Sequence, residues 1–208
     1  MIIAVDGPTA SGKGTIARAL AAHFGLPHLD TGLLYRAVGY QVMRNHGDPD
    51  NAANALTATA FDDDLLTNPT LRSETTGAIA SRVSIHPEVR AALLTRQRAF
   101  ADQPGGAVLD GRDIATVIAP HANAKLYVTA SVAARTLRRY LEMRKRGEDV
   151  SRDAITADLT ARDTRDTTRA TAPLRRADGA ALLDTSALTP EGAIAAAIAL
   201  VLRQVGSN

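Results

Sequence analysis

The stretch MIIAVDGPTASGKGTIARALAAHFGLPHLDTGLLYR, residues 1–36, decides the fold of this 208-residue chain. Within it, residues 7–13 have the spacing G-x-x-x-x-G-K of a phosphate-binding loop. The apolar run Ile2–Val5 before the loop suits a buried parallel strand. Apolar residues after the loop recur at every fourth position up to Phe24, which predicts an amphipathic helix. Strand, glycine-bounded loop and helix therefore follow in the order that phosphate binding needs.

The residue types in this loop suit an anion. Glycine lets the backbone come close to a ligand, and a helix start aims N–H groups and the positive end of its dipole at it. Lys13 adds a mobile positive charge for the outer phosphates. The predicted ligand is a nucleoside polyphosphate, held by Gly7, Pro8, Thr9, Ala10, Ser11, Gly12, Lys13, Gly14 and Thr15.

Composition narrows the class of protein. A hydrophobic content of 45% with only 3% aromatic residues predicts one α/β domain with an aliphatic core, plus a small insertion. The absence of cysteine excludes disulfides and thiolate metal sites and fits a reducing compartment. Because no long apolar segment occurs, we expect a soluble, cytoplasmic protein with no membrane partner.

The net charge of +2 is unevenly distributed. Residues 135–176 hold 12 Lys or Arg against 7 Asp or Glu, and the rest of the chain holds 12 against 15. Nucleic-acid binding would explain this bias, but few aromatic residues accompany the arginines to stack on bases. A polyphosphate site lined with arginine explains it equally well, and solvated helix faces account for a part.

Short apolar runs predict five strands, at residues 2–6, 27–30, 107–110, 125–128 and 181–184. Helical spacing between them favours a mostly parallel sheet covered by helices on both faces. Right-handed crossovers place all strand carboxyl ends on one rim. We therefore expect one shared cleft that gathers residues 7–15, Asp30 with Thr31, residues 110–113 and the residues after Asp184.

Helical spacing also predicts which side chains turn inward. In helix 131–146 these are Ala133, Leu137, Tyr140 and Leu141, and in the last helix Ile194, Ile198, Val201 and Leu202. In the helix after Pro87, the arginines at 90, 96 and 98 are expected to point away from the buried side. Residues 48–86 are the least regular part, which suggests an insertion able to move as a lid or clamp. Three consecutive carboxylates at 62–64 cannot face one point, so no metal site is expected there.

Four collinear blocks carry a resemblance to a known family. Gly14 stands where many phosphate loops have a Ser or Thr for magnesium, and the ending Gly-Lys-Gly-Thr is typical of nucleoside monophosphate kinases. The chain resembles the bacterial cytidylate kinase family through residues 7–15 (GPTASGKGT), 30–36 (DTGLLYR), 110–113 (DGRD) and 162–169 (RDTRDTTR).

This resemblance implies a fold and an activity. The fold is a three-layer phosphate-loop kinase domain over 1–208, with a small helical acceptor-binding insertion at 31–100 and a short lid at 144–168. The activity is direct phosphoryl transfer from ATP with Mg²⁺ to CMP or dCMP, in a monomer with no nucleic-acid partner. The usual insertion has extra antiparallel strands, for which residues 60–76 are too short, so acceptor contacts there are less defined.

The resemblance also implies roles for single residues. Thr31, Ser81 and Arg90 match positions near the cytosine, Arg36 and Arg112 match positions at the acceptor phosphate, and Asp113 matches one near the ribose. Arg162, Asp166 and Arg169 match the residues that contact the ribose and the arginines that close over the transferred phosphoryl group. The catalytic set is Lys13, Arg112, Arg162 and Arg169. No direct metal ligand is implied, but Asp30 and Asp110 are candidates to anchor the waters of magnesium.

The spacing of Arg162, Asp166 and Arg169 supports their roles independently, because one helix face carries all three beyond the apolar Ile155 and Leu159. A surface ladder of ion pairs is the alternative for this face. Two other functions stay open. A kinase for UMP, AMP or a sugar or shikimate-type alcohol would share the core, and an alcohol acceptor would need a general base. A nucleotide-dependent RNA-binding module would show salt-dependent RNA affinity without turnover.

Overall fold

The computed structural model describes residues 1–206 as two compact units. The sheet unit comprises Met1–Leu29 and the described part of Ala101–Asn208, and the helical unit comprises Asp30–Phe100. Among the described residues, no helix has both the length and the apolar character needed to cross a membrane.

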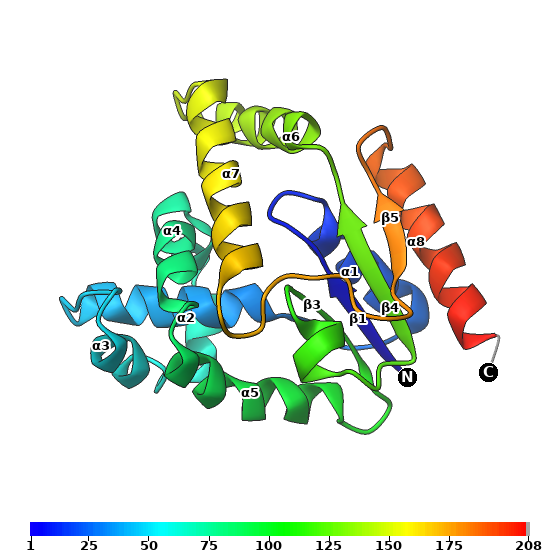
Figure 1. The fold of residues 1–208 in the computed structure, drawn as a ribbon, viewed down its shortest axis with the longest axis horizontal. Helices are drawn as coiled ribbons and strands as arrows, with labels where there is room; N and C mark the ends of the chain where they lie inside the picture. The colour runs from blue at the N-terminus through cyan, green and yellow to red at the C-terminus, as the bar shows by residue number, and fades with distance from the viewer. Residues whose placement is uncertain (207–208) are drawn as a thin grey trace. The chain divides into compact units, whose positions relative to one another are not determined.

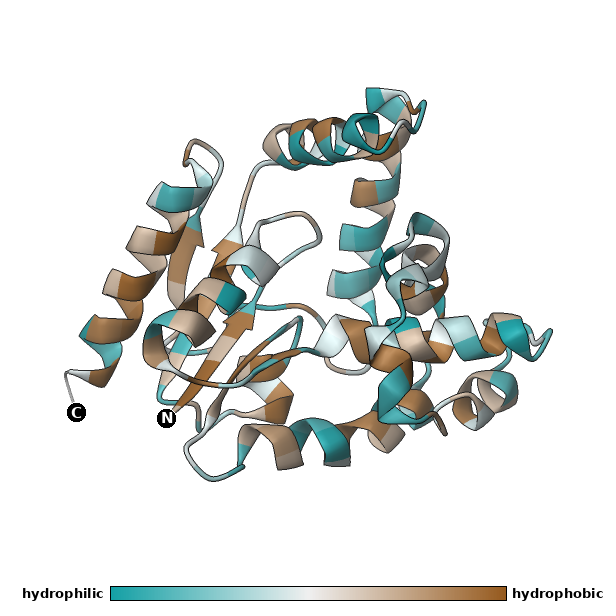
Figure 2. Cartoon of the chain, turned by 180° about the vertical axis from the view of Figure 1, so that it is seen from behind, coloured by the Kyte–Doolittle hydropathy of each residue, from teal (hydrophilic) through white to brown (hydrophobic). Residues whose placement is uncertain are grey.

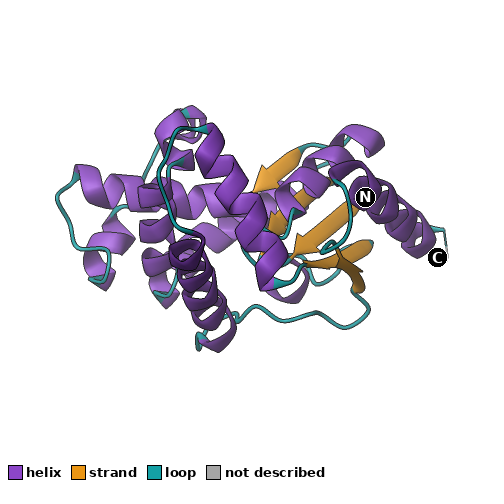
Figure 3. Ribbon diagram, turned by 90° about the horizontal axis from the view of Figure 1, so that it is seen from above, coloured by secondary structure: helices purple, strands orange, loops and turns teal. Residues whose placement is uncertain are grey.

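The sheet unit is built on five strands in the order β2-β3-β1-β4-β5. Figure 1 labels β1, β3, β4 and β5, and Figure 3 shows strands in orange with helices around them. Their bounds are β1 Ile2–Asp6, β2 His28–Asp30, β3 Ala107–Gly111, β4 Ala124–Thr129 and β5 Ala181–Asp184. The sheet is parallel, and β1 pairs with β3 on one side (Ile3 opposite Val108) and with β4 on the other (Val5 opposite Leu126). The predicted five-stranded parallel sheet is therefore confirmed, with strand bounds within two residues.

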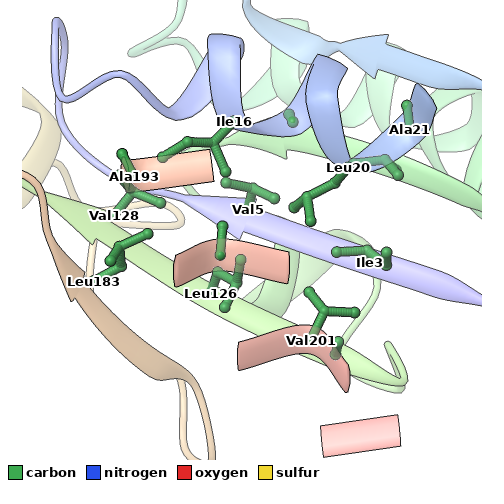
Figure 4. Packing of buried hydrophobic residues seen from close by; sticks show 14 residues of the cluster. Ile3, Val5, Ile16, Leu20, Ala21, Leu126, Val128, Leu183, Ala193 and Val201 are labelled. Atoms are coloured by element: carbon green, nitrogen blue, oxygen red, sulfur yellow. The ribbon is translucent and has the colours of Figure 1, made fainter. Parts of the chain in front are cut away.

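The helices of the sheet unit are α1 Lys13–Phe24, α6 Val132–Lys145, α7 Arg152–Thr168 and α8 Pro190–Val205, with a single π-helical turn at Ile114–Ile118. Side chains from α1 and α8 meet those of the strands in one apolar cluster (Figure 4). Ile16 and Leu20 of α1 cover Ile3 and Val5 of β1, and all four are buried. This aliphatic core fixes the strand ends from which the functional loops leave.

Hydropathy distinguishes the helices of this unit (Figure 2). The strands and much of α8 are hydrophobic, whereas α7 is mostly hydrophilic. The predicted inward face of α6 is wrong for three of its four residues: Ala133 is exposed, and Leu137 and Leu141 are 44% and 51% exposed. The fourth, Tyr140, is half-buried and packs against Met143, Ile155 and Leu159. The buried residues are instead Arg135, Thr136 and Met143. The reason is that α6 packs against the charged helix α7, where Arg135 meets a carboxylate.

The last helix turns a partly different stripe inward, and of the four residues predicted there Val201 is confirmed as buried. Ala193, Ala197 and Val201 are buried against the sheet, whereas Leu202 is 49% exposed, so its predicted place in the core is wrong. Ile194 and Ile198 are half-buried, and Ile198 packs at the margin of the cluster. Small alanines let α8 lie close to β4 and β5, which leaves the larger residues to its flanks.

The helical unit contains α2 Thr31–Arg44, α3 Ala52–Thr57, α4 Glu74–Val83 and α5 Pro87–Ala101, with short 3₁₀ turns at Asp63–Thr67 and Pro69–Arg72. Residues 48–86 are thus more regular than predicted, because α4 is a full helix capped by the Ser73 hydroxyl. Gly39 of α2 lies so close to α4 that an added Cβ would be 3.0 Å from Ile79. Contact through small residues leaves no apolar periodicity for a sequence pattern to detect.

Candidate active site

The phosphate loop, residues 7–12, joins β1 to α1. At Gly7 a Cβ would stand 2.0 Å from the carbonyl oxygen of Val128, so only glycine fits beside β4. Gly12 has a φ of 88° at the start of α1, and Ala10 has a φ of 61°, a value uncommon for a residue with a side chain. The loop therefore has a specified backbone conformation, leading into a helix start that favours an anion.

An ionic cluster lies next to this loop in the sheet unit. Arg112, directly after β3, donates from Nε to Asp166 Oδ2 at 2.6 Å and from NH2 to Thr9 Oγ1 at 2.6 Å. Arg169 lies 3.8 Å from Asp113 and 3.9 Å from Asp166, and its Nε donates to the Ala172 carbonyl at 2.8 Å. The structure thus brings these four predicted residues together beside the loop.

Electrostatics keep the Asp166 carboxyl ionised. Burial opposes the charge of Asp166, but Arg112, Arg169 and Lys13 outweigh it and lower the pKa of the carboxyl below its ordinary value. The influence of Lys13 on Asp166 shows that the loop lysine belongs to the same electrostatic environment. A set of cations that already stabilises a buried carboxylate is suited to stabilise phosphate oxygens.

Helix α7 carries the predicted charged face. Ile155 and Leu159 are buried in its first turns, and Arg162 and Asp166 are buried further along. Arg162 pairs with Asp158, at 3.0 Å between Nε and Oδ2. Arg169 caps the helix with extended backbone and so lies just beyond its last turn. The face is buried over most of its length, which contradicts the alternative of a solvated ladder of ion pairs.

Asp6 lies buried at the end of β1, immediately before the loop. Its two carboxylate oxygens each accept a 2.8 Å hydrogen bond, one from the N–H of Ile114 and one from that of Ala115. Burial raises the pKa of Asp6 to about 7, although both hydrogen bonds act against the rise. Asp6 therefore holds the turn that follows Arg112 and Asp113, a role that the sequence did not indicate.

Asp110 is the magnesium anchor candidate in the sheet unit. It is buried at the end of β3, its Oδ1 lies 2.8 Å from Nε2 of His28, and its Oδ2 lies 3.7 Å from where a Cβ of Gly14 would be. A carboxylate under the start of α1 suits the hydration shell of a magnesium ion. Among the described residues, no group of three or more His, Asp or Glu side chains is arranged to hold a metal directly.

A cavity of about 160 Å³ opens beside the end of the phosphate loop. Its walls include the apolar Ile16, Leu188 and Pro190, together with Arg138. Arg138 NH1 donates to Thr185 Oγ1 at 3.0 Å, and this hydroxyl donates to the Ser11 carbonyl at 2.9 Å. The cavity brings residues after Asp184 to the phosphate loop, as the sequence predicted, whereas sequence reasoning missed the contribution of Arg138 from α6.

Ser11 lines this cavity, and its buried hydroxyl oxygen has no hydrogen-bond partner among the described residues. A buried polar atom without a partner is costly unless a ligand or water satisfies it. Ser11 and the cavity walls together form a site for a small, largely apolar ligand group attached to whatever the loop binds.

In the helical unit, Arg36 of α2 is held in a socket. Its NH1 donates to the carbonyls of Leu71 and Ser73 at 2.7 and 2.8 Å. A Cβ on Gly77 of α4 would lie 2.6 Å from its NH2, so Gly77 leaves the space that the guanidinium occupies. Ser81 is one helical turn further on the same face of α4, which brings it to the same side as Arg36.

Arg90 departs from the predicted orientation. It is only 7% exposed, which contradicts the expectation that it points away from the buried side of α5. Its NH1 donates to the Ser84 carbonyl at 3.3 Å, and its guanidinium carbon lies 5.4 Å from the ring centre of Tyr35. The reason is that this attraction between cation and aromatic ring compensates for lost hydration. Thr31, the first residue of α2, is buried, and Asp30 precedes it at the helix start.

Comparison with known proteins decides the family. The family model described as "Cytidylate kinase" matches residues 3–203. The chain belongs to the cytidylate kinase family. A protein of Xanthobacter autotrophicus named cytidylate kinase is 57% identical over 97% of each chain. A protein of that name from Methylocella silvestris is 54% identical over 97% of this chain and 94% of its own. One from Rhodopseudomonas palustris is 52% identical over 97% of this chain and 96% of its own.

A solved structure shares the fold as well. The crystal structure of an uncharacterized protein from Eubacterium ventriosum matches all of this chain and 99% of its own, with a TM-score of 0.54 and 12% identity. At that identity the likeness concerns the fold alone. As a member of its family, the chain is a kinase of the α/β phosphate-loop class, which confirms the predicted family and fold class.

Proposed function

We propose that this protein transfers the γ-phosphoryl group of ATP to the phosphate of CMP and dCMP. The observation that carries the proposal is the phosphate loop with Lys13 beside the Arg112–Asp166–Arg169 cluster, in a chain whose relatives are named cytidylate kinase. In this proposal residues 7–15 hold the ATP phosphates. The cavity lined by Ile16, Arg138 and Pro190 takes the adenine ring, and the Ser11 hydroxyl pairs with the nucleotide there.

Arg36 and Arg112 are each proposed to bind the phosphate of the acceptor nucleotide. Thr31, Ser81 and Arg90 then contact the cytosine, and Asp113, Arg162 and Asp166 the ribose. The phosphate oxygen of CMP is already an anion at neutral pH, so its attack on the γ-phosphorus needs no general base.

Positive charge around the migrating group performs the catalysis. Lys13, Arg112, Arg162 and Arg169 neutralise the charge that spreads over the equatorial oxygens in the transition state. Magnesium bound to ATP supplies further charge neutralisation on the phosphates. Asp110, and Asp30 of the helical unit, would accept hydrogen bonds from its waters, and Thr15 would lie near the α-phosphate. We also propose a cytoplasmic location, on the cysteine-free composition of the chain, and a monomeric state.

A coupled ADP-release assay with ATP, Mg²⁺ and a panel of CMP, dCMP, UMP and AMP tests the activity. Turnover fastest with CMP or dCMP supports the proposal. Preference for UMP or AMP, or for an alcohol, assigns another kinase activity. Absence of turnover with all acceptors, together with RNA affinity that falls steeply with salt, assigns the binding module instead.

The Arg36→Ala variant tests the acceptor site. Loss of a charge-assisted contact to phosphate is expected to raise the KM for CMP about a hundredfold, with the Kd for ATP changed less than about twofold. Arg82→Ala is the matched control, because Arg82 lies on α4 of the same unit and pairs with Asp50 on the exposed surface. Equal loss of CMP and ATP affinity in the Arg36 variant would contradict its assignment to the acceptor.

A further inference from the structure

Thr9 of the phosphate loop is bound at both of its polar oxygens by arginines. Arg112 NH2 donates to the Thr9 hydroxyl oxygen at 2.6 Å, and Arg135 NH1 donates to the Thr9 carbonyl oxygen at 3.2 Å. Arg112 follows β3, whereas Arg135 lies in the first turn of α6. Two separate segments of the sheet unit therefore hold one loop residue.

Both arginines are paired in turn with carboxylates of α7. Arg112 pairs with Asp166 at 2.6 Å, and Arg135 pairs with Asp163 through two hydrogen bonds of 3.0 and 2.6 Å. Asp163 and Asp166 are three residues apart, so they lie on one face of the helix. The result is two parallel connections from α7, each running from a carboxylate through a guanidinium to Thr9.

The Arg135 connection is the more constrained of the two. The side chain of Arg135 is only 4% exposed, and its Nε donates to the Ala130 carbonyl at 3.0 Å. A planar guanidinium with bonds on three sides has one orientation available to it. Its contact with Thr9 therefore transmits the position of α7 and of the β4–α6 junction to the loop.

The Thr9 carbonyl controls the next amide of the loop. It shares a planar trans peptide with the N–H of Ala10, so fixing the oxygen toward Arg135 aims that N–H in the opposite direction. Ala10 then adopts its φ of 61°, which is unfavourable for a side-chain-bearing residue and persists only where neighbouring contacts impose it. Without Arg135, this peptide is free to rotate and present a carbonyl oxygen in place of an N–H.

We infer that Arg135 and Asp163 are positioning residues for the donor nucleotide: through the Thr9 carbonyl they hold the Thr9–Ala10 peptide in the orientation that binds phosphate. This inference rests on the proposed function, in which the loop binds ATP. It adds to that function a link between α7 and the affinity for ATP, made by two residues that need not contact either nucleotide.

The experiment measures ATP binding by calorimetry, without acceptor, in Asp163→Asn, Arg135→Gln and the double variant. Each single variant is expected to weaken ATP binding about tenfold, since one buried charge-assisted bond is lost. The double variant should lose no more ATP affinity than the more affected of the two single variants, because both residues act through one contact. The KM for CMP should change less than about twofold. Glu142→Gln on α6 is the control, since Glu142 pairs with Arg139 in a half-exposed position.

Two milder variants cover the case in which these fail to fold. Asp163→Glu keeps the carboxylate and should restore most of the ATP affinity, and Arg135→Lys keeps the charge but not the two-bond pairing and should not. Unchanged ATP affinity in Asp163→Asn overturns the inference, and Arg135→Lys decides in the same way if Asp163→Asn fails to fold. The inference is also overturned if the two single losses of ATP affinity add up in the double variant. Equal losses of affinity for ATP and for CMP overturn it as well. If the wild-type protein itself does not bind ATP, the proposed function fails instead.

Discussion

The sheet unit contains two helix pairs that are stabilised in different ways. Helices α1 and α8 bury apolar side chains against the strands in one large cluster. Helices α6 and α7 share a small cluster whose buried members are Met143, Ile155 and Leu159, and otherwise contact each other and the loop through ion pairs. The first pair is therefore stabilised by apolar packing, and the second mainly by charged groups that can also interact with an anionic ligand.

The energies of these two kinds of contact differ. Burying one Leu or Ile contributes roughly 1.5–3 kcal/mol, whereas a buried ion pair must first offset its own desolvation. Helices held mainly by ion pairs therefore belong to the less stable parts of a fold, where local opening is cheapest. The lid at 144–168 stays a prediction. The difference between the two pairs separates substitutions that affect stability from those that affect turnover.

The largest expected effect is on turnover, from a substitution in the charged region at the phosphate loop. Lys13→Ala should lower kcat about a thousandfold, because one fixed donor to transferring phosphate oxygens is lost. The free energy of unfolding should change by less than about 1 kcal/mol, since the Lys13 side chain is only half-buried. Steady-state kinetics and urea unfolding measure both, with Lys145→Ala, an exposed lysine at the end of α6, as control. Near-normal turnover would remove Lys13 from the mechanism.

The next effect concerns Asp6, the buried carboxyl group at the end of β1. Because its native pKa of about 7 lies above its ordinary value of 3.8, the folded state holds this proton more tightly. The resulting stabilisation is complete below pH 3.8 and is lost as the pH rises to about 7, by about 4 kcal/mol in total. Asp6→Asn should remove this contribution, so the unfolding free energy should decline less from pH 5 to 7.5 than in the wild type. An equal decline in both proteins would refute the assignment.

The smallest effect compares leucines of the two regions. Leu126→Ala in the apolar cluster should lower the free energy of unfolding by about 3 kcal/mol, because it leaves a cavity. Leu141→Ala on α6 should lower it by less than about 0.5 kcal/mol, because this side chain is exposed. Urea unfolding of both variants is the measurement. Comparable losses would mean that α6 is held by apolar contacts after all.

The errors of sequence reasoning fall on the charged region and on close helix contacts. Period-3.6 analysis assigned Leu137 and Leu141 to the core because it assumes that an inward face is apolar, and α6 instead faces the carboxylates of α7. The same assumption led to the wrong prediction that Arg90 points away from the buried side of α5, although the Tyr35 ring stabilises it within the helical unit. For the strands the assumption holds, since both faces of β1 and β3 are buried, and there the predictions agree with the structure.

The sequence by itself determined what depends on neighbouring residues: the strand, loop and helix around Gly7 and Lys13, the alternation that makes a parallel sheet, and the four blocks that indicate the family. Only the tertiary structure decided the socket that Gly77 opens for Arg36 and the two connections that reach Thr9. The physical reason is distance along the chain. Thr9 and Arg135 are 126 residues apart, so their contact exists only after the strands between them have paired.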